Sequence, residues 1–282
     1  MCRHLAYIGA PATLRSVIID PPHGLYKQAW APRFQRSGAI NADGFGVGWY
    51  PAANLESANL KWASPEPARY RQPVPMWGDE SFADVARVTQ SGAMLAAVRN
   101  ATPGASHGPA ANAPFRHGQW LFSHNGAVDG WPESVGGLAA TLPAVSLLEL
   151  EARVDSALVW ALVLDRLRRG LAPADALADT AEAVRAAGVT GRFNLLLTDG
   201  GVIAGTAAGH TLYYRRTPES VTVASEPGDD EPGWIEIPRG ALVTATPGQV
   251  SVTPLLALNA IITGRPADET PPDGRITTVD IT

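Results

Sequence analysis

The sequence is poor in cysteine and in lysine. Its 282 residues contain a single cysteine, Cys2, which excludes a disulfide within the chain and a zinc site built from cysteines. Of the 22 basic residues only Lys27 and Lys61 are lysines, and 27 acidic residues leave a net charge of −5. Because proteins that bind a phosphate backbone carry clustered basic residues, we expect no nucleic-acid partner.

Long hydrophobic runs are also missing. No apolar stretch approaches the roughly 20 residues that a membrane-spanning helix requires. The first residues include Arg3 and His4 and not the apolar core of a secretory signal. An unpaired cysteine is most stable in a reducing compartment. The sequence therefore predicts a cytoplasmic protein without a membrane partner.

The composition is otherwise that of a globular protein, with 45% hydrophobic and 17% charged residues. Strand-like segments come first, two helical segments follow and strands return, without the alternation of a doubly wound sheet, which indicates an α+β fold. The predicted strands are 4–8, 45–50, 93–99, 120–124, 193–198, 202–206, 212–216, 221–225 and 241–246, and the predicted helices are 155–169 and 173–188. We expect one domain over residues 2–263 and a polar, proline-rich tail over 264–282.

Cys2 directly follows the initiator methionine. Removal of Met1 would leave a residue that carries both a thiol and a free α-amine. Because an α-amine titrates near ~8, it can accept the thiol proton at neutral pH, so one residue would supply nucleophile and base. The alternative is a small residue at a frayed terminus, and position alone does not decide between them.

The segment Ser123-His124-Asn125-Gly126 closes an apolar strand. Asn-Gly is an ordinary turn sequence. An acyl-transfer enzyme, however, needs hydrogen-bond donors aimed at a developing oxyanion, and a side-chain amide beside a glycine N–H supplies two. Both interpretations of Asn125 and Gly126 stay open at this point.

Two charged residues stand at the ends of predicted elements. Arg99 follows the apolar run 93–98, where it is either a surface arginine or a guanidinium suited to bidentate binding of a carboxylate. Asp155 begins the predicted helix 155–169, a position that suits a helix N-cap, and Gly170 ends that helix.

Other motif-like patterns carry less chemistry. Gly44, Gly46 and Gly48 alternate along a strand, which fails the dinucleotide-binding spacing and indicates close approach of another backbone or of a substrate. The segment Gly104-Ala105-Ser106-His107-Gly108 has the letters of a nucleophile elbow, but prolines stand where the following helix should start. The six histidines form no i, i+4 pair, so we expect no metal site and no cofactor.

Taken in order, these residues resemble the glutaminase domain of the class II glutamine amidotransferases, which are N-terminal-nucleophile hydrolases. The shared set is Met1-Cys2, Asn41-Ala42-Asp43-Gly44-Phe45-Gly46-Val47-Gly48-Trp49, Arg99, Ser123-His124-Asn125-Gly126 and Asp155. Within this family, Met1-Cys2-Arg3-His4-Leu5 and Asp20-Pro21-Pro22-His23-Gly24-Leu25 are similar to the γ-glutamyl amidohydrolases of ergothioneine biosynthesis. The resemblance extends to about Pro254.

The resemblance implies a four-layer αββα sandwich of two antiparallel sheets between helical layers. It implies Cys2 as the nucleophile, with its α-amine as the base, and an oxyanion hole formed by the Asn125 side chain and the Gly126 N–H. Arg99 would bind the α-carboxylate of a glutamyl group and Asp155 its α-ammonium. One departure is Asn100, because many family members have tryptophan after the arginine, so the wall of the glutamyl pocket is in doubt.

The resemblance also implies hydrolysis of a small γ-glutamyl amide through a Cys2 thioester. The expected substrate is γ-glutamyl-hercynylcysteine sulfoxide, which would yield glutamate and hercynylcysteine sulfoxide. Two alternatives stay open: a glutaminase subunit that supplies ammonia to a partner synthase, and an inactive binder of γ-glutamyl compounds. The sequence leaves the oligomeric state open.

The leaving-group pocket is open as well. Aromatic residues that could stack on a cationic leaving group, and that equally fit ordinary packing, are Trp30, Trp49, Tyr50, Tyr70 and Trp77.

Overall fold

Two antiparallel sheets form the centre of the fold. The structure is a computed structural model that describes residues 2–35, 40–51, 66–101 and 106–262. The first sheet has the strand order β11 (Trp234–Glu236), β9 (Tyr213–Arg216), β10 (Ser220–Ala224), β1 (Arg3–Thr13), β4 (Gln90–Arg99), β2 (Gly44–Trp49) and β3 (Ala68–Gln72). The second sheet has the order β13 (Gln249–Pro254), β12 (Ala241–Thr246), β8 (Ile203–Ala207), β7 (Gly191–Thr198), β6 (Trp120–Val128) and β5 (Phe115–His117).

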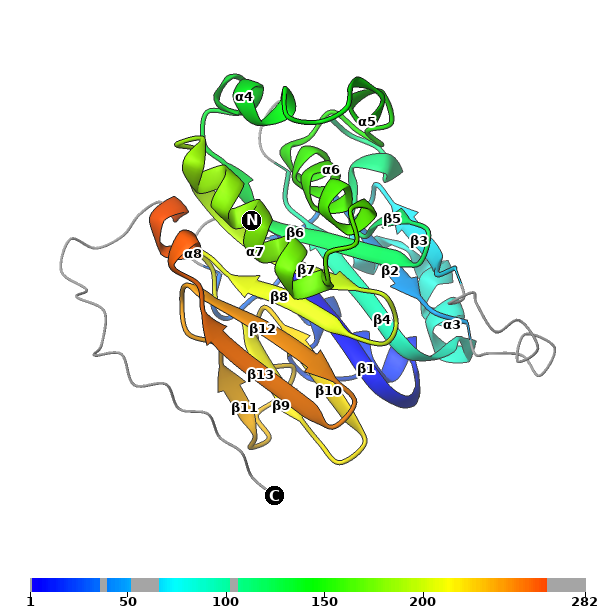
Figure 1. Cartoon of the computed structure of the whole chain (residues 1–282). Coiled ribbons are helices and arrows are strands. Elements are labelled where there is room, and N and C mark those ends of the chain that lie inside the picture. The colour runs from blue at the N-terminus through cyan, green and yellow to red at the C-terminus, as the bar shows by residue number, and fades with distance from the viewer. Residues whose placement is uncertain (1, 36–39, 52–65, 102–105, 263–282) are drawn as a thin grey trace, which may run out of the picture.

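Helices cover the outer face of each sheet (Figure 1). The described helices are α1 (Leu14–Ile18), α2 (Leu25–Gln28), α3 (Glu80–Val88), α4 (Gly136–Ala139), α5 (Ala144–Leu148), α6 (Asp155–Arg168), α7 (Pro173–Ala186) and α8 (Leu256–Ile261). The first three pack on the β1 sheet, and α6, α7 and α8 pack on the β7 sheet.

The alternation of side chains along the strands produces the layers. On β1, Leu5 and Tyr7 pack against the helices α1 to α3, whereas Ala6 and Ile8 point into the core between the sheets. On β7, Leu195 faces the helices α6 and α7, whereas Leu196 faces the other sheet. Since successive strand residues point to opposite faces, strands that are apolar throughout bury both faces. The predicted four-layer αββα order is confirmed.

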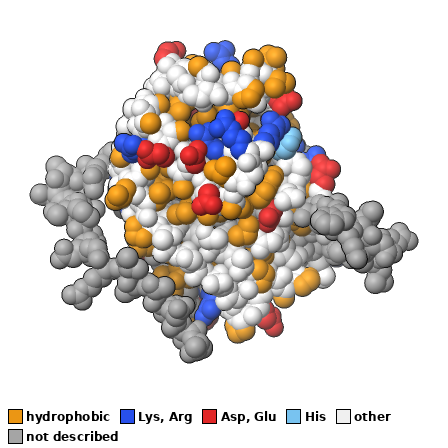
Figure 2. Space-filling view, viewed as in Figure 1, with side chains coloured by type: hydrophobic (Ala, Val, Ile, Leu, Met, Phe, Trp, Pro, Cys, Tyr) orange, Lys and Arg blue, Asp and Glu red, His pale blue; other side chains and the backbone are white. Residues whose placement is uncertain are grey.

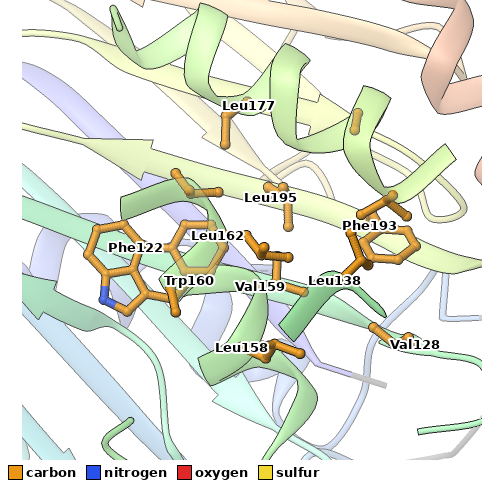
Figure 3. Close-up of a cluster of buried hydrophobic side chains, with 14 of the residues drawn as sticks. Phe122, Val128, Leu138, Leu158, Val159, Trp160, Leu162, Leu177, Phe193 and Leu195 are labelled. Atoms are coloured by element: carbon orange, nitrogen blue, oxygen red, sulfur yellow. The ribbon is translucent and has the colours of Figure 1, made fainter. Parts of the chain in front are cut away.

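The largest apolar cluster lies between the second sheet and its helices (Figure 3). Trp160 of α6 stacks on Phe122 of β6 with ring centroids 5.1 Å apart. Leu158, Val159 and Leu162 of the same helix are also buried. Helix α6 is therefore buried on most of its circumference, and it fixes the position of the strand β6 beneath it.

The two predicted helices are confirmed as α6 and α7. Each is followed by a glycine with positive φ, Gly170 at +89° and Gly188 at +67°, which is the left-handed conformation that ends many helices. Pro173 stands at the first position of α7, where its missing N–H costs no hydrogen bond.

The alternating glycines of β2 bring two backbones close together. A Cβ atom on Gly46 would collide with the carbonyl oxygen of Ala113, and one on Gly48 would lie 2.7 Å from Leu121 Cδ1. The predicted close approach of another backbone is confirmed, and it lets β2 lie directly against the segment before β5.

The surface carries charges of both signs. Figure 2 shows basic and acidic side chains side by side on the face viewed in Figure 1. Helix α6 contributes such pairs, with Arg166 Nε 2.8 Å from Asp179 and Arg168 3.5 Å from Glu149. No helix within the described ranges is long and apolar enough to span a membrane. The predicted tail 264–282 lies outside the described residues, so the domain boundary stays a prediction.

Candidate active site

Cys2 directly precedes the central strand β1, which pairs with β4 on one side and β10 on the other. Strand alternation places Cys2 on the same face as His4 and Ala6, which points between the sheets. The thiol is half-buried and free, and its Sγ donates to the carbonyl oxygen of Asn100 at 3.9 Å. The sole thiol thus lies at one end of the two sheets, on the side of β1 that faces the second sheet.

Asn125 faces the same place from the opposite sheet. It is fully buried on β6, and its Nδ2 donates to Ser225 Oγ at 3.3 Å. The same hydroxyl accepts the backbone N–H of His4 at 3.0 Å, and the N–H of Ser225 donates to the His4 carbonyl. Ser225 therefore ties the Asn125 amide to the strand that begins at Cys2.

Gly126 must be glycine for steric reasons. A Cβ atom here would collide with the carbonyl oxygen of Arg192 and with Nε2 of His124. Gly126 continues the strand β6 beside Asn125 and pairs with Phe193 on β7. The predicted alternative, an ordinary Asn-Gly turn, is wrong, because both residues lie inside a strand.

Arg99 ends the strand β4, next to Asn100 and so next to Cys2. Its side chain is 9% exposed; one terminal nitrogen donates to the Ser106 carbonyl at 3.0 Å and the other, Nη1, is buried without a partner. Asp43 fixes this position, since its N–H donates to the Arg99 carbonyl and its carboxylate accepts the N–H of Ala101 at 2.7 Å. Arg99 is thus not the surface arginine of the alternative interpretation.

Asp155 joins the start of α6 to the end of β6. Its Oδ2 accepts the N–H of Val128 at 2.9 Å and its Oδ1 accepts the N–H of Ser156 at 2.7 Å. The predicted N-cap position is wrong by one residue, since Val154 precedes the helix and Asp155 is its first residue. The carboxylate still lies at the start of the helix. The N–H that it accepts belongs to Val128, which stands two residues after Gly126 on β6.

A layer of polar side chains surrounds these residues. His4 is fully buried, with Nδ1 3.0 Å from Ser123 Oγ. Burial, reinforced by His124 and the positive charge of Arg3, holds the pKa of His4 well below its usual range. His4 is therefore neutral at pH 7 and acts as a hydrogen-bonding group beneath the thiol, not as a charge.

The opposite face of β1 carries a buried ion pair. Arg3 Nε lies 2.9 Å from Glu226, and both side chains are about 1% exposed. Burial lowers the pKa of Arg3, and the charges of Glu226 and Cys2 partly offset this. The Glu226 carboxylate also accepts the N–H of Arg33 at 2.7 Å. The pair anchors the residue next to Cys2 from behind the sheet.

The structure brings together the residues that the sequence singled out. Cys2, Arg99, Asn125, Gly126 and Asp155 all lie at one end of the two sheets, linked by the contacts above. Gly104 and Ala105 of the elbow-like segment lie outside the described residues. Ser106 Oγ, from the same segment, donates to the Arg153 carbonyl.

Sequence reasoning missed Ser225, His4 and Ser123. The spacing of His4 from Cys2 was the available signal, because residues two apart on a strand share a face. Within the described part of the chain, no group of three His, Cys, Asp or Glu side chains could hold a metal ion.

The five aromatic residues pack elsewhere. Trp30 lies edge-on to Trp77 at 5.6 Å, on the helix side of the first sheet. Tyr50 is buried and donates to the Thr198 carbonyl, and Tyr70 donates to Asp79. Trp49 also packs against the outer cluster. Ordinary packing accounts for all five.

Residues 28–220 match the family of class-II glutamine amidotransferases. The chain belongs to the class II glutamine amidotransferases. It is 42% identical over 255 residues to the γ-glutamyl-hercynylcysteine sulfoxide hydrolase of Mycolicibacterium smegmatis, covering 90% of this chain and 100% of that protein. It is 40% identical to the protein of the same name in Mycobacterium tuberculosis, covering 90% and 97% of the two chains.

Two solved structures share the fold. A class-II domain protein from Silicibacter pomeroyi superposes with a TM-score of 0.62 at 24% identity, covering 90% of this chain and 99% of that one. The glutamine phosphoribosylpyrophosphate amidotransferase of B. subtilis gives 0.62 at 13% identity, with 90% and 49% covered. The N-terminal-nucleophile hydrolase fold expected from the sequence is confirmed.

Proposed function

We propose that this class II glutamine amidotransferase is a hydrolase of γ-glutamyl amides that uses Cys2 as its nucleophile. The observation that carries the proposal is the link from Asn125 through Ser225 to His4, two residues from Cys2. The unpaired Nη1 of Arg99 lies on β4, next to the residue that accepts the thiol. Removal of Met1 gives Cys2 a free α-amine, which takes the thiol proton as the thiolate attacks the γ-carbonyl carbon.

The attack produces a tetrahedral intermediate with a negative oxygen. An amide Nδ2 has two hydrogens, and in Asn125 only one of them is used by Ser225. The other hydrogen and the N–H of Gly126 are the donors that we propose for the oxyanion. The α-ammonium of Cys2 then protonates the leaving nitrogen, the C–N bond breaks and a γ-glutamyl thioester forms on Cys2.

Water completes the reaction. It adds to the thioester carbonyl while the α-amine accepts its proton, the C–S bond breaks, and the thiolate recovers a proton as glutamate leaves. Formation and hydrolysis of the thioester need neither a redox step nor a cofactor.

Recognition of the glutamyl end needs one partner of each charge. Arg99 presents a buried, unpaired Nη1 that suits the α-carboxylate. Asp155 presents a half-buried carboxylate that suits the α-ammonium. Their bonds to Ser106 and Val128 hold both groups in place before the substrate binds.

The substrate that we propose is γ-glutamyl-hercynylcysteine sulfoxide. The mycobacterial relatives, which are 40–42% identical over 90% of this chain, are named as hydrolases of this compound. The products are glutamate and hercynylcysteine sulfoxide. We place the reaction in the cytoplasm, because an unpaired thiol is most stable in a reducing compartment.

The test uses full-length protein whose free Cys2 terminus is verified by the mass of the N-terminal peptide. We expect glutamate release from γ-glutamyl-hercynylcysteine sulfoxide, and none from Cys2→Ala or from protein that retains Met1. Hydrolysis of other γ-glutamyl amides with that compound left intact would overturn the substrate. Hydrolysis by Cys2→Ala would overturn the nucleophile.

Two further outcomes identify the alternatives. Binding without turnover by the native protein would make it a binder of γ-glutamyl compounds. Glutamine turnover that rises only when a synthase is added would make it a glutaminase subunit.

A further inference from the structure

Arg192 is a cation without a counterion at the edge of the proposed active site. The described arginines that are buried or half-buried and have a carboxylate within ion-pair distance are Arg3, Arg15, Arg69, Arg71, Arg116, Arg166 and Arg215. Among the buried and half-buried arginines that the structure describes, only Arg99 and Arg192 have none. The Nε of Arg192 is buried and has no hydrogen-bond partner. Arg192 is half-buried, and a buried N–H without a partner costs free energy that an anion accepting it would recover.

Strand geometry places Arg192 on the face of β7 that points toward the first sheet. On β7 it shares a face with Asn194 and Leu196, and Leu196 belongs to the core between the sheets. Its register partner on β6 is Ala127, two residues beyond Asn125. Gly209 leaves room for the arginine stem, because a Cβ atom there would lie 2.7 Å from Arg192 Cγ.

His210 stands next to this arginine. Asn194 fixes its backbone, accepting the His210 N–H at 2.9 Å and donating to the His210 carbonyl at 3.0 Å. Burial, followed by the charges of Arg3 and Arg192, lowers the pKa of His210 to about 3. The ring is therefore neutral, and its Nε2 is buried without a partner. Arg192 and His210 thus each have a buried polar nitrogen without a partner, and Gly209 sets His210 beside the stem of Arg192.

A hydrogen bond and the packing of one glycine place these two groups toward the β10 side of β1, whereas Arg99 lies on the β4 side. Strands β4 and β2 lie on one side of β1, and β10 lies on the other. Arg99 comes from β4, whereas His210 precedes Thr211, whose hydroxyl donates to the Ser225 carbonyl at the end of β10. The stem of Arg192, on β7 of the other sheet, packs against Gly209 beside His210. A substrate held by its glutamyl end at Arg99 therefore directs its leaving group toward Arg192.

We propose that Arg192 and His210 bind the α-carboxylate of an amino-acid leaving group, so that the site selects γ-glutamyl amino acids over glutamine. This inference rests on the proposed function. In a γ-glutamyl amino acid the scissile nitrogen is bonded to a carbon that bears a carboxylate, whereas glutamine releases only ammonia. The guanidinium would pair with that carboxylate, and a neutral imidazole can donate its Nε2–H to it.

The test compares two substrates that differ only in this carboxylate: γ-glutamyl-S-methylcysteine and the γ-glutamyl amide of 2-(methylthio)ethylamine. We expect the native protein to cleave the first with a kcat/KM on the order of 10- to 100-fold higher, the factor that a hydrogen bond to a charged group contributes. Arg192→Met removes that preference, Arg192→Lys retains part of it, and His210→Asn lowers it by a smaller factor. The matched control is Arg216→Met, an exposed arginine on β9, which leaves the preference unchanged.

Each outcome has one meaning. Equal rates on both substrates with the native protein, or an equal loss on both in Arg192→Met, overturns the carboxylate assignment and leaves γ-glutamyl hydrolysis intact. Failure of the native protein on both amides, while it cleaves γ-glutamyl-hercynylcysteine sulfoxide, overturns this inference, because the carboxylate would then not suffice for recognition. Failure on that compound as well overturns the proposed function itself. The comparison with native protein needs no variant, so it remains decisive even where Arg192→Met does not fold.

Discussion

The side-chain amide of Asn125 donates to Ser225 Oγ across 3.3 Å, from one sheet to the other. Ser225 directly follows β10, and its hydroxyl also accepts the N–H of His4 on β1. One hydroxyl thus sets the distance between the proposed oxyanion donor and the strand that carries the nucleophile. Because both hydrogen bonds are buried, water does not compete for them.

Ser225→Ala should therefore impair turnover more than binding. We expect kcat to fall roughly tenfold, as one buried hydrogen bond is lost, with KM nearly unchanged. Ser225→Thr keeps the hydroxyl and should restore most of kcat. Steady-state kinetics measures both values, and Ser220→Ala on the same strand is the control. A rise in KM at constant kcat would contradict a positioning role.

Asn125→Ala should reduce kcat by roughly 10²- to 10³-fold, the typical effect of removing one oxyanion donor. Thioester formation measured in a single turnover should slow by the same factor, because the oxyanion forms in that step. Circular dichroism checks that the variant is folded. A folded variant with native kcat would show that Asn125 supplies no catalytic hydrogen bond.

Glu151 makes stability depend on acid pH. Burial disfavours its charge, but hydrogen bonds and charges from Arg69, at 2.9 Å, and Arg71, at 2.7 Å, produce a net lowering of its pKa. Its stabilising contribution is therefore present above about pH 4, the unfolded value, and is lost as the pH falls through the lower folded pKa.

Glu151→Gln should accordingly lower the free energy of unfolding at pH 7 by about 1–3 kcal/mol. Urea unfolding at several pH values should show this difference shrinking below about pH 4. The exposed Glu133→Gln is the control. A difference that persists undiminished at low pH would exclude the ion pairs as its cause.

Trp160, which stacks on Phe122, is the residue whose substitution best tests the packing of the apolar core. Trp160→Ala should lower the free energy of unfolding by about 3–5 kcal/mol, because it leaves a cavity between α6 and β6. Leu148→Ala, at a side chain that is 87% exposed, should change it by less than about 0.5 kcal/mol. Comparable losses in both variants would contradict the packing in Figure 3.

The long apolar strands and the helices α6 and α7 could be predicted from sequence, because their patterns and end signals are local. Strands such as β5 and β11 could not, since each has three residues and depends on a neighbouring strand for its hydrogen bonds. The edge strand β13 alternates exposed and half-buried residues and carries little apolar signal.

The candidate site also contains residues that could be predicted from the sequence and residues that could not. Cys2, Arg99 and Asn125 were predictable because they stand in ordered motifs. Ser225 and His210 were not, because their significance arises only when segments about 100 and 200 residues apart meet across the sheets. No local pattern distinguishes an inward serine beside an oxyanion donor from any other strand-end serine.

Strand β1 is hydrogen-bonded on both edges and has apolar layers on both faces. Amide protons of Leu5 and Ala6 should therefore exchange with deuterium only when the whole molecule unfolds. The proposed nucleophile thus extends from the slowest-exchanging segment of the protein. The proposed nucleophile would then hold its position relative to both sheets before a substrate binds.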